Sequence, residues 1–302
     1  MHERYLHYVR KKPIYSSRVN LEISHTTRYE YDQMVQFHPH LLYLRPRENP
    51  LLRVNRFEFA LTPDATIYWM RDDFDNLPAS AHFPLQSDTL EIGVHCVVET
   101  SEKPLFDFLV RDYATEFPFE YEPLHRFNLA IYLTRPEPAT CKALKEWLQP
   151  RFQFQPTNTI AWLLELNQVI HRSLSYGRRD EPGIQSALET IRSNTGSCRD
   201  YATLFVAVAR MLGVAARFVS GYLYDPSLNQ AAGGDMHAWV EVFLPGAGWR
   251  GLDPTNGIFC NSFYVPVAHA VIAESINPIQ GSFYGAASAS STLTKHVAIK
   301  QI

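Results

Sequence analysis

The sequence of 302 residues lacks any pair of cysteines in the Cys-x-x-Cys spacing and has only four cysteines in all. These are Cys96, Cys141, Cys198 and Cys260. A zinc ribbon needs closely spaced ligand pairs, and a disulfide scaffold is typical of much shorter secreted chains. The pattern argues against both and favours a reducing compartment, so we expect a cytoplasmic protein without a metal site.

The sequence also lacks an excess of charge of either sign. Its 28 basic and 31 acidic residues give a formal net charge of -3, so no strong field is expected to attract nucleic acid or an anionic membrane surface. Long apolar runs are missing as well, and the charged first residues have no apolar segment of the kind found in signal peptides. We therefore expect neither nucleic acid nor a membrane among the partners.

The first part of the chain alternates apolar and polar residues. Runs such as 21–31 and 89–99 have a period of two and are separated by turn residues, which predicts a β-sandwich-like domain over residues 20–135. The last part of this domain carries many large apolar side chains, so it is expected to pack as a connector across the domain junction. Residues 1–19 are expected to form an irregular arm.

Residues 136–302 begin with a different pattern, in which apolar residues recur at intervals of three and four. This spacing predicts helices, and alternating runs farther along predict strands. The predicted helices are 140–148, 158–174 and 200–212, and the predicted strands are 216–224, 238–244, 249–253 and 292–299. Helices followed by antiparallel strands are typical of an α+β domain.

Cys198 lies between a Gly-Ser turn and the strongly apolar helix predicted at 200–212. The positive end of a helix favours a thiolate over a thiol, and the first N–H groups of a helix have no partner within it. Such donors suit an oxyanion that develops beside the cysteine. A single cysteine is by itself more often a buried structural residue, so the interpretation depends on two further residues.

His237 and Asp253 supply the base and the orienting group that a nucleophilic cysteine needs. A turn centred near Gly246 would pair residues whose numbers add to about 492. Asp253 then faces Trp239, diagonally beside His237 on the same side of the sheet. A carboxylate there can accept the imidazole N–H and fix its tautomer. Taken singly, His237 is also plausible as a strand histidine and Asp253 as a turn residue.

These residues lie in blocks that resemble the motifs of the transglutaminase-like superfamily. The blocks are Gly-Ser-Cys-Arg-Asp-Tyr-Ala at 196–202, His-Ala-Trp-Val-Glu-Val at 237–242 and Gly-Trp-Arg-Gly-Leu-Asp-Pro-Thr at 248–255. The stretch from Leu21 to Glu99 is similar to the bacterial transglutaminase N-terminal domain. The resemblance implies a papain-like second half, with Cys198 as nucleophile, His237 as base and Asp253 as orienting carboxylate. It also implies an enzyme that needs no cofactor, of a kind described as a cysteine protease or as a transglutaminase.

We therefore expect an α+β protein, with a β-sandwich-like domain followed by a papain-like, transglutaminase-core domain. Its expected activity is acyl transfer from a peptide or protein amide through a thioester on Cys198. Water as the acceptor gives a protease or amidase, and an amine gives a protein-glutamine transglutaminase. The triad is the same in each case. We favour hydrolysis because water is always present and no amine site is evident.

Two other classes of function are weighed against this enzyme. A non-catalytic binding module of the same fold would have no need for an intact triad. Metal binding by Cys198, His237 and Asp253 conflicts with the closely spaced ligand pairs that zinc prefers. The sequence does not indicate the natural substrate or the oligomeric state.

Two aromatic residues and one segment have a less defined role. Tyr176 precedes the nucleophile where the family often has an aromatic residue, and it either donates to the oxyanion or packs, with packing slightly favoured. Trp239 either walls the cleft or belongs to the core. Many relatives have a Gly-Arg-Asp stretch near the last strands, whereas residues 269–278 here read His-Ala-Val-Ile-Ala-Glu-Ser-Ile-Asn-Pro. Any substrate contact from that segment is therefore in doubt.

Overall fold

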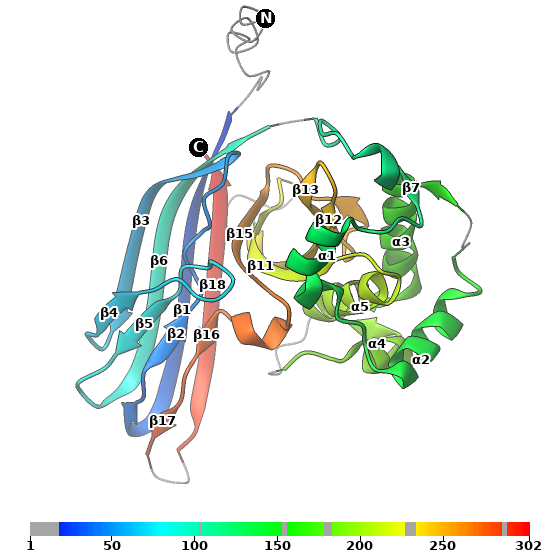
Figure 1. Cartoon of the computed structure of the whole chain (residues 1–302). Coiled ribbons are helices and arrows are strands. Elements are labelled where there is room, and N and C mark those ends of the chain that lie inside the picture. Colours follow the sequence, from blue (N-terminus) through cyan, green and yellow to red (C-terminus); the bar gives the residue numbers. More distant parts are fainter. Residues whose placement is uncertain (1–17, 103, 153–155, 178–182, 227–233, 286–288) are drawn as a thin grey trace, which may run out of the picture.

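The computed structural model describes residues 18–102, 104–152, 156–177, 183–226, 234–285 and 289–302. The chain forms two lobes, one of long strands and one that carries the helices around a second sheet (Figure 1). The arm predicted at residues 1–19 lies almost entirely outside the described residues.

The β-rich lobe is built on three long antiparallel strands. β1 (Arg18–Phe37) pairs with β6 (Ser87–Ser101), and β6 pairs with β3 (Leu52–Thr62). Alternate side chains of β1, such as Leu21 and Ile23, are fully buried, while the residues between them are partly exposed. This period of two is the pattern that predicts strands from sequence, and here the prediction is confirmed.

A shorter sheet forms a second layer of this lobe. Its strands in spatial order are β16 (Ile279–Gln280), β2 (His40–Leu42), β5 (Ala79–His82) and β4 (Thr66–Trp69). The Trp69 ring lies 5.7 Å from the ring of Phe57 and 5.9 Å from that of Phe59, both on β3. These contacts between layers give the lobe its apolar interior.

The last strand of the chain returns to this first lobe. β18 (Ser291–Gln301) pairs antiparallel with β1, from Leu21 opposite Gln301 to Tyr31 opposite Ser291. β17 (Phe283–Tyr284) pairs with the far end of β1. A strand over 292–299 was expected from the alternation, but as part of a domain spanning 136–302. It instead completes the sheet of the first domain, because β1 offers it an unpaired edge.

The helices of the second lobe are α1 (Pro123–Asn128), α2 (Pro138–Leu148), α3 (Thr159–Ser173), α4 (Ala187–Ser193) and α5 (Cys198–Met211). Single 3-10 turns occur at Asp112–Ala114, Ala130–Leu133 and Ala273–Ile276. The sequence carries the capping signals. Asn158 accepts two backbone N–H groups of the first turn of α3, and Ser186 forms a capping box with Glu189 at the start of α4.

The sheet of the second lobe is antiparallel. Its strands in spatial order are β14 (Ile258–Phe259), β13 (Gly248–Asp253), β12 (Gly234–Leu244), β11 (Ala216–Tyr224) and β15 (Tyr264–Ala270). Leu244 pairs with Gly248 and Val240 with Leu252, which is the register predicted from the turn near Gly246. Two-residue strands form two further short pairs: β7 (Glu116–Phe117) with β8 (Thr157–Asn158), and β9 (Ser175–Tyr176) with β10 (Thr195–Gly196).

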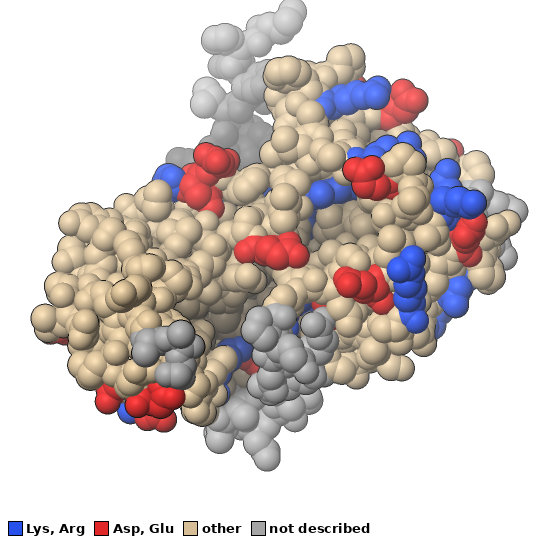
Figure 2. Space-filling view, turned by 90° about the horizontal axis from the view of Figure 1, so that it is seen from below, with Lys and Arg blue, Asp and Glu red and all other residues tan. Residues whose placement is uncertain are grey.

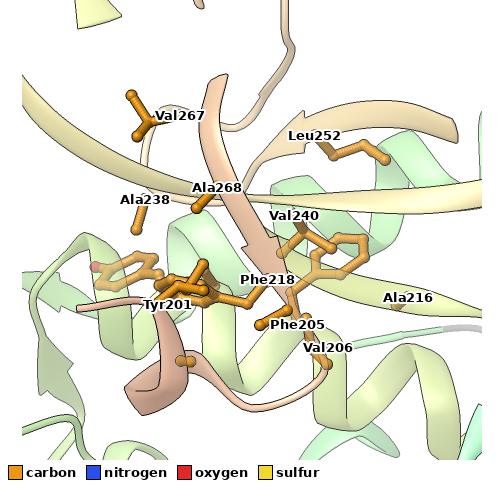
Figure 3. Packing of buried hydrophobic residues seen from close by; sticks show 14 of the residues in the cluster. Tyr201, Phe205, Val206, Ala216, Phe218, Ala238, Val240, Leu252, Val267 and Ala268 are labelled. Carbon is orange, nitrogen blue, oxygen red and sulfur yellow. The ribbon is translucent and has the colours of Figure 1, made fainter. Parts of the chain in front are cut away.

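α5 packs against one face of this sheet and buries the centre of the lobe (Figure 3). The buried side chains drawn there include Tyr201, Phe205 and Val206 of the helix and Ala216, Phe218, Ala238, Val240, Leu252, Val267 and Ala268 of the strands. Because this packing removes a large apolar area from water, it holds the start of α5 at a fixed place beside the sheet.

Buried polar contacts join the two lobes. The hydroxyl of Tyr222 on β11 lies 3.1 Å from Nδ1 of His25 on β1 and donates to the carbonyl of Leu44 at 3.4 Å. The side-chain amide of Asn76 exchanges two hydrogen bonds of 2.9 Å with the backbone of His269 on β15. The β-rich lobe thus contacts the same sheet that carries His237.

The architecture is the α+β class expected from the sequence, with a β-rich first part followed by a lobe of helices packed on an antiparallel sheet. Among the described residues, no helix combines the length and the apolar character needed to cross a bilayer.

Candidate active site

Cys198 is the first residue of α5, and a buried carboxylate fixes the turn before it. Oδ2 of Asp200 accepts the backbone N–H of Ser197 at 2.7 Å and its hydroxyl at 2.9 Å. Oδ1 accepts the N–H of Gln185 at 2.7 Å. Gly196 is needed here because a Cβ would lie only 2.8 Å from the Cβ of Asp200. The negative charge of Asp200 interacts favourably with the positive end of the helix dipole. Asp200 also holds the turn that presents the thiol.

The structure brings the three predicted residues into one line of contacts. Nε2 of His237 lies 2.8 Å from Oδ2 of Asp253, and the imidazole is also hydrogen-bonded to the side chain of Cys198. Since Nε2 faces Asp253, Nδ1 is the ring nitrogen that remains for the thiol. The backbone N–H of Ala238 donates to the sulfur as well.

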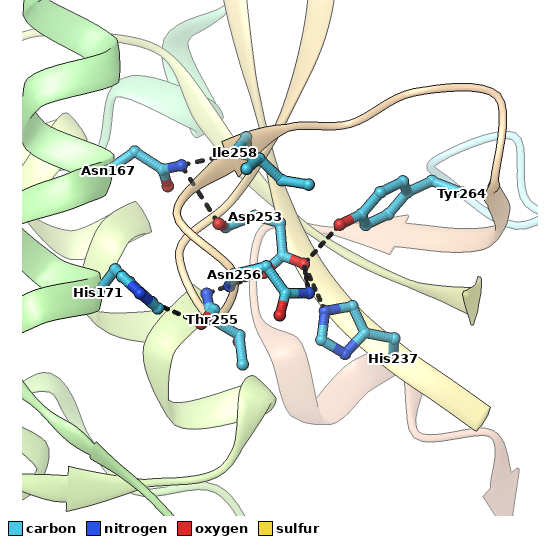
Figure 4. A network of polar contacts seen from close by, with 8 residues as sticks. All are labelled: Asn167, His171, His237, Asp253, Thr255, Asn256, Ile258 and Tyr264. Carbon is cyan, nitrogen blue, oxygen red and sulfur yellow. Dashed lines mark hydrogen bonds and ion pairs between the residues drawn. The ribbon is translucent and has the colours of Figure 1, made fainter. Parts of the chain in front are cut away.

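Asp253 is completely buried, and donors surround its carboxylate (Figure 4). Besides His237, the hydroxyl of Tyr264 and the side-chain amide of Asn256 each donate to Oδ2 at 2.7 Å. The backbone N–H groups of Thr255 and Asn256 donate to Oδ1 at 2.8 and 3.2 Å. A buried charge is tolerated where its lone pairs are satisfied in this way.

α3 anchors the loop that carries these donors. Asn167 is fully buried, and its amide donates to the backbone carbonyls of Asp253 and Ile258 at 3.2 and 3.1 Å. One turn further along the helix, Nδ1 of His171 lies 2.7 Å from the carbonyl of Thr255 (Figure 4). The end of β13 is therefore fixed from the helical side as well as from the sheet.

The three groups shift one another's pKa values. Burial opposes ionisation of the thiol, but the contact with His237 and the N–H of Ala238 leave the pKa of Cys198 below its ordinary value. Burial also opposes the imidazolium, yet Asp253 and Cys198 together raise the pKa of His237. Despite its burial, Asp253 has a lowered pKa because His237, Tyr264 and Asn256 stabilise the carboxylate. The arrangement thus favours a thiolate beside an imidazolium.

The other cysteines have different surroundings. Burial raises the pKa of Cys96 to about 12, and it raises that of Cys260 far above its ordinary value. Cys141 is half-buried, and its sulfur donates to the carbonyl of Pro136 at 3.2 Å. Within the described structure, none of these three thiols is hydrogen-bonded to a histidine, in contrast to Cys198.

Tyr176 and Trp239 differ in burial. Tyr176 belongs to β9, which runs parallel to β10 just before Cys198, and its side chain is 57% exposed. It is therefore at the surface beside the nucleophile and not in the core. Trp239 is only 2% exposed, and its ring lies 5.4 Å from that of Tyr264. Of its two predicted roles, the structure places it in the core behind His237.

Sequence reasoning missed Tyr264 and Asn256, which complete the surroundings of Asp253. Asn256 follows closely on Asp253 in a turn, and an Asx residue there is a recognisable signal for local hydrogen bonds. Tyr264 is on β15, the strand at the opposite edge of the sheet, and no feature of the sequence indicates that it reaches Asp253.

The segment 269–278 continues β15 into a single 3-10 turn. Burial, together with Arg217 and Arg47, lowers the pKa of His269 to about 2, so this residue is a neutral part of the lobe interface. Within the described ranges, no three His, Cys, Asp or Glu side chains are grouped as metal ligands.

Two family models match the chain. Residues 146–254 match the transglutaminase-like superfamily, and residues 21–99 match the bacterial transglutaminase-like N-terminal region. The first match contains Cys198, His237 and Asp253. The second coincides with β1 to β6.

Among individual proteins, an uncharacterized protein of Mycobacterium tuberculosis is 26% identical in an alignment over 288 residues that covers 87% of each chain. A protein-glutamine gamma-glutamyltransferase of Pseudomonas aeruginosa is 34% identical in an alignment over 111 residues that covers 33% of this chain and 16% of that protein. The crystal structure of a candidate cysteine protease from Cytophaga hutchinsonii superimposes with a TM-score of 0.72 at 19% identity. It covers 95% of this chain and 92% of the other, so the fold is shared along almost the whole length.

Proposed function

Because this chain belongs to the transglutaminase-like superfamily through residues 146–254, we propose that it is a cysteine enzyme that acts on an amide through a thioester on Cys198. The observation that carries the proposal is the line of contacts from Cys198 through His237 to the buried Asp253. A thiol beside an imidazole that a carboxylate orients is the arrangement of nucleophilic catalysis.

In the first half of the reaction, the thiolate of Cys198 attacks the amide carbonyl and forms a carbon–sulfur bond. The carbonyl oxygen becomes an oxyanion, for which backbone N–H groups at a helix start such as that of α5 are suitable donors. The imidazolium of His237 then gives its proton to the nitrogen as the carbon–nitrogen bond breaks. The amine leaves, and the acyl group remains as a thioester.

In the second half, neutral His237 removes a proton from the acceptor as it attacks the thioester. The carbon–sulfur bond breaks, and the thiolate–imidazolium pair is restored. Asp253 keeps its negative charge throughout and fixes the orientation of the ring. We propose water as the acceptor, which makes the enzyme a protease or amidase.

An amine acceptor is the second candidate. It is favoured by the 34% identity, over 111 residues, to a protein named protein-glutamine gamma-glutamyltransferase. The first half of the reaction is unchanged, and the amine replaces water in the second half.

Alkylation tests the nucleophile without knowledge of the substrate. Near pH 6, the lowered pKa of Cys198 should leave a larger fraction of it as thiolate than of an ordinary thiol. We expect iodoacetamide to modify Cys198 far faster than Cys96, Cys141 or Cys260, as measured by peptide mass spectrometry after brief labelling. Equal labelling of all four would contradict the enzyme proposal and favour a binding module.

Partitioning of an acyl-enzyme distinguishes the two acceptors. p-Nitrophenyl acetate should acylate Cys198 with a burst of nitrophenol that Cys198→Ala abolishes. The acetyl group is then followed with and without added putrescine. Acetate as the main product in both cases supports hydrolysis, whereas N-acetylputrescine as the main product identifies a transferase.

A further inference from the structure

Oδ2 of Asp253 is shared by more donors than an oxygen atom ordinarily serves. His237, Tyr264 and Asn256 approach it at 2.8, 2.7 and 2.7 Å. A carboxylate oxygen has two lone pairs, so each donor weakens the hold of the oxygen on the other two. The strength of the hydrogen bond between Asp253 and His237 therefore depends on the hydrogen bonds that Tyr264 and Asn256 donate to the same oxygen.

Tyr264 is not needed to hold the carboxylate in place. Two backbone N–H groups fix Oδ1, and Asn167 fixes the backbone carbonyl of Asp253. The side-chain amide of Asn256 already fills a second place on Oδ2. The orientation of Asp253 is thus determined several times over, and what the Tyr264 hydroxyl adds is a competing charge-assisted hydrogen bond.

The phenol is suited to donate at every physiological pH. Its side chain is 7% exposed, and its ring contacts those of Trp239 and His237 at 5.4 and 6.2 Å. Burial, followed by the neighbouring Cys260 and the Asp253 carboxylate, raises the pKa of Tyr264 far above its ordinary value. The hydroxyl keeps its proton, and that proton points at the carboxylate.

We propose that Tyr264 is a positioning residue that tempers the triad: by sharing Oδ2 of Asp253 it limits how tightly the imidazolium of His237 is held. The inference rests on the proposed function. During acylation His237 must give up its proton to the leaving nitrogen, and an imidazolium held too tightly is a poor acid. When Tyr264 shares the carboxylate of Asp253, the carboxylate still orients the ring of His237. The imidazolium then releases its proton more readily.

Several titratable groups lie around the pair of Asp253 and His237, and the test must isolate one of them. Tyr264 contacts Asp253 and Cys198 contacts His237. The others act on neighbours of the pair: Arg199 on Cys198, Glu241 on Cys260, and His171 on the carbonyl of Thr255. Replacing only the hydroxyl of Tyr264 leaves all the others in place.

The experiment measures the rate of Cys198 alkylation by iodoacetamide against pH. In Tyr264→Phe the ring stays and the donor is lost, so Asp253 holds the imidazolium more tightly and the thiolate forms at lower pH. We expect the acid limb of the profile to move down by about half a pH unit or more. A residue that merely held Asp253 in place would, when removed, loosen the pair and move the limb up.

Two further variants complete the test. Tyr121→Phe is the matched control, because that buried hydroxyl bonds only backbone atoms of Phe243 and Ala215 in the described structure. It should leave the acid limb unchanged. Asn256→Ala removes the other competing donor at an exposed residue, so it folds even if Tyr264→Phe does not, and it should move the limb down as well.

The outcomes separate this inference from the proposed function. If the wild-type profile resembles that of an ordinary thiol, the proposed function is wrong. If the wild type shows the lowered limb but Tyr264→Phe and Asn256→Ala leave it unmoved or raise it, the tempering role is wrong and the triad stands.

Discussion

Asp253 is a charged side chain that the protein buries completely and then surrounds with donors. Its distance of 2.8 Å from Nε2 of His237 gives it one proposed task, to orient the ring and stabilise the imidazolium. Because Asp253 lies behind His237 and away from the surface, its removal should affect the chemical step and not substrate affinity.

We expect Asp253→Asn to lower turnover by about one to three orders of magnitude. The loss should be smaller than in Cys198→Ala or His237→Ala, because a thiol ionises more readily than the hydroxyl of a serine triad. The measurement is kcat and KM for the three variants on one amide substrate. If Asp253→Asn keeps full turnover while His237→Ala is inactive, another residue orients the base.

Cys198, His237 and Asp253 could be predicted from the sequence, whereas the contact of Tyr264 with Asp253 could not. Cys198 and Asp253 stand at the ends of strongly patterned elements, and the turn near Gly246 determines which strand residues face each other. Tyr264 depends on the path of β15 to the opposite edge of the sheet. That path is set by tertiary packing and leaves no trace in local spacing.

At the scale of elements, the turn before α5 matters most for the site. The carboxylate of Asp200 joins Ser197 to Gln185, two segments that no helical hydrogen bond connects. Loss of this group would leave buried N–H donors without partners, and it would let the first turn of α5 shift.

We expect Asp200→Ala to lower the free energy of unfolding by about 2–3 kcal/mol and to slow Cys198 alkylation. Glu189→Ala is the matched control, because Glu189 is the acid of the capping box of α4 but is solvent-exposed. It should cost about 0.5–1 kcal/mol and leave alkylation unchanged. Urea denaturation and labelling rates check both. An equal loss of unfolding free energy in the two variants would show that the burial of Asp200 does not add to its contribution to stability.

The positions of the helices and strands can be predicted from the hydrophobic period. The pairing partner of a strand cannot always be predicted in this way. The hairpin of β12 and β13 is local, so its register could be predicted from the turn. β18 pairs with β1 across almost the whole chain. Alternation identifies β18 as a strand without saying which edge it joins.

The pairing of β18 gives a prediction on this strand. Ile299 is 1% exposed and Leu293 is 53% exposed. We expect Ile299→Ala to cost about 2–5 kcal/mol and Leu293→Ala less than about 0.5 kcal/mol. Thermal and urea unfolding of the two variants measure the difference. Similar small costs would mean that β18 is not held against the rest of the protein.

At the scale of the whole molecule, the two lobes meet through buried polar groups as well as apolar ones. His25 on β1 contacts Tyr222 on β11 and Thr27 on its own strand. Burial, reinforced by Lys295 and opposed by Asp235, lowers the pKa of His25 to about 4. The interface therefore contains an imidazole that the native state keeps neutral.

This imidazole should make the protein sensitive to acid. As pH falls through about 6.5, the unfolded chain gains a proton at His25 that the native state resists down to about pH 4. His25 should thus remove up to about 3 kcal/mol from the free energy of unfolding over this interval. We expect His25→Gln to reduce the decrease in the free energy of unfolding as the pH is lowered. His296→Gln, which replaces an exposed side chain, should leave this decrease unchanged. Urea denaturation at several pH values in this interval measures the effect. If the free energy of unfolding depends on pH in the same way in all three proteins, His25 is not the source of the acid sensitivity.

The pairing of β1 with β18 also bears on how the protein is made. On the ribosome, β1 emerges early, and its partner of residues 291–301 emerges only after the whole lobe that carries Cys198. Until then, the edge of β1 that β18 will cover is an open template for pairing with another nascent chain. The segment between them is long, and contacts between distant segments form slowly. We therefore expect the helical lobe to be the first to fold during translation, and the β-rich lobe to depend on chaperones until its last strand arrives.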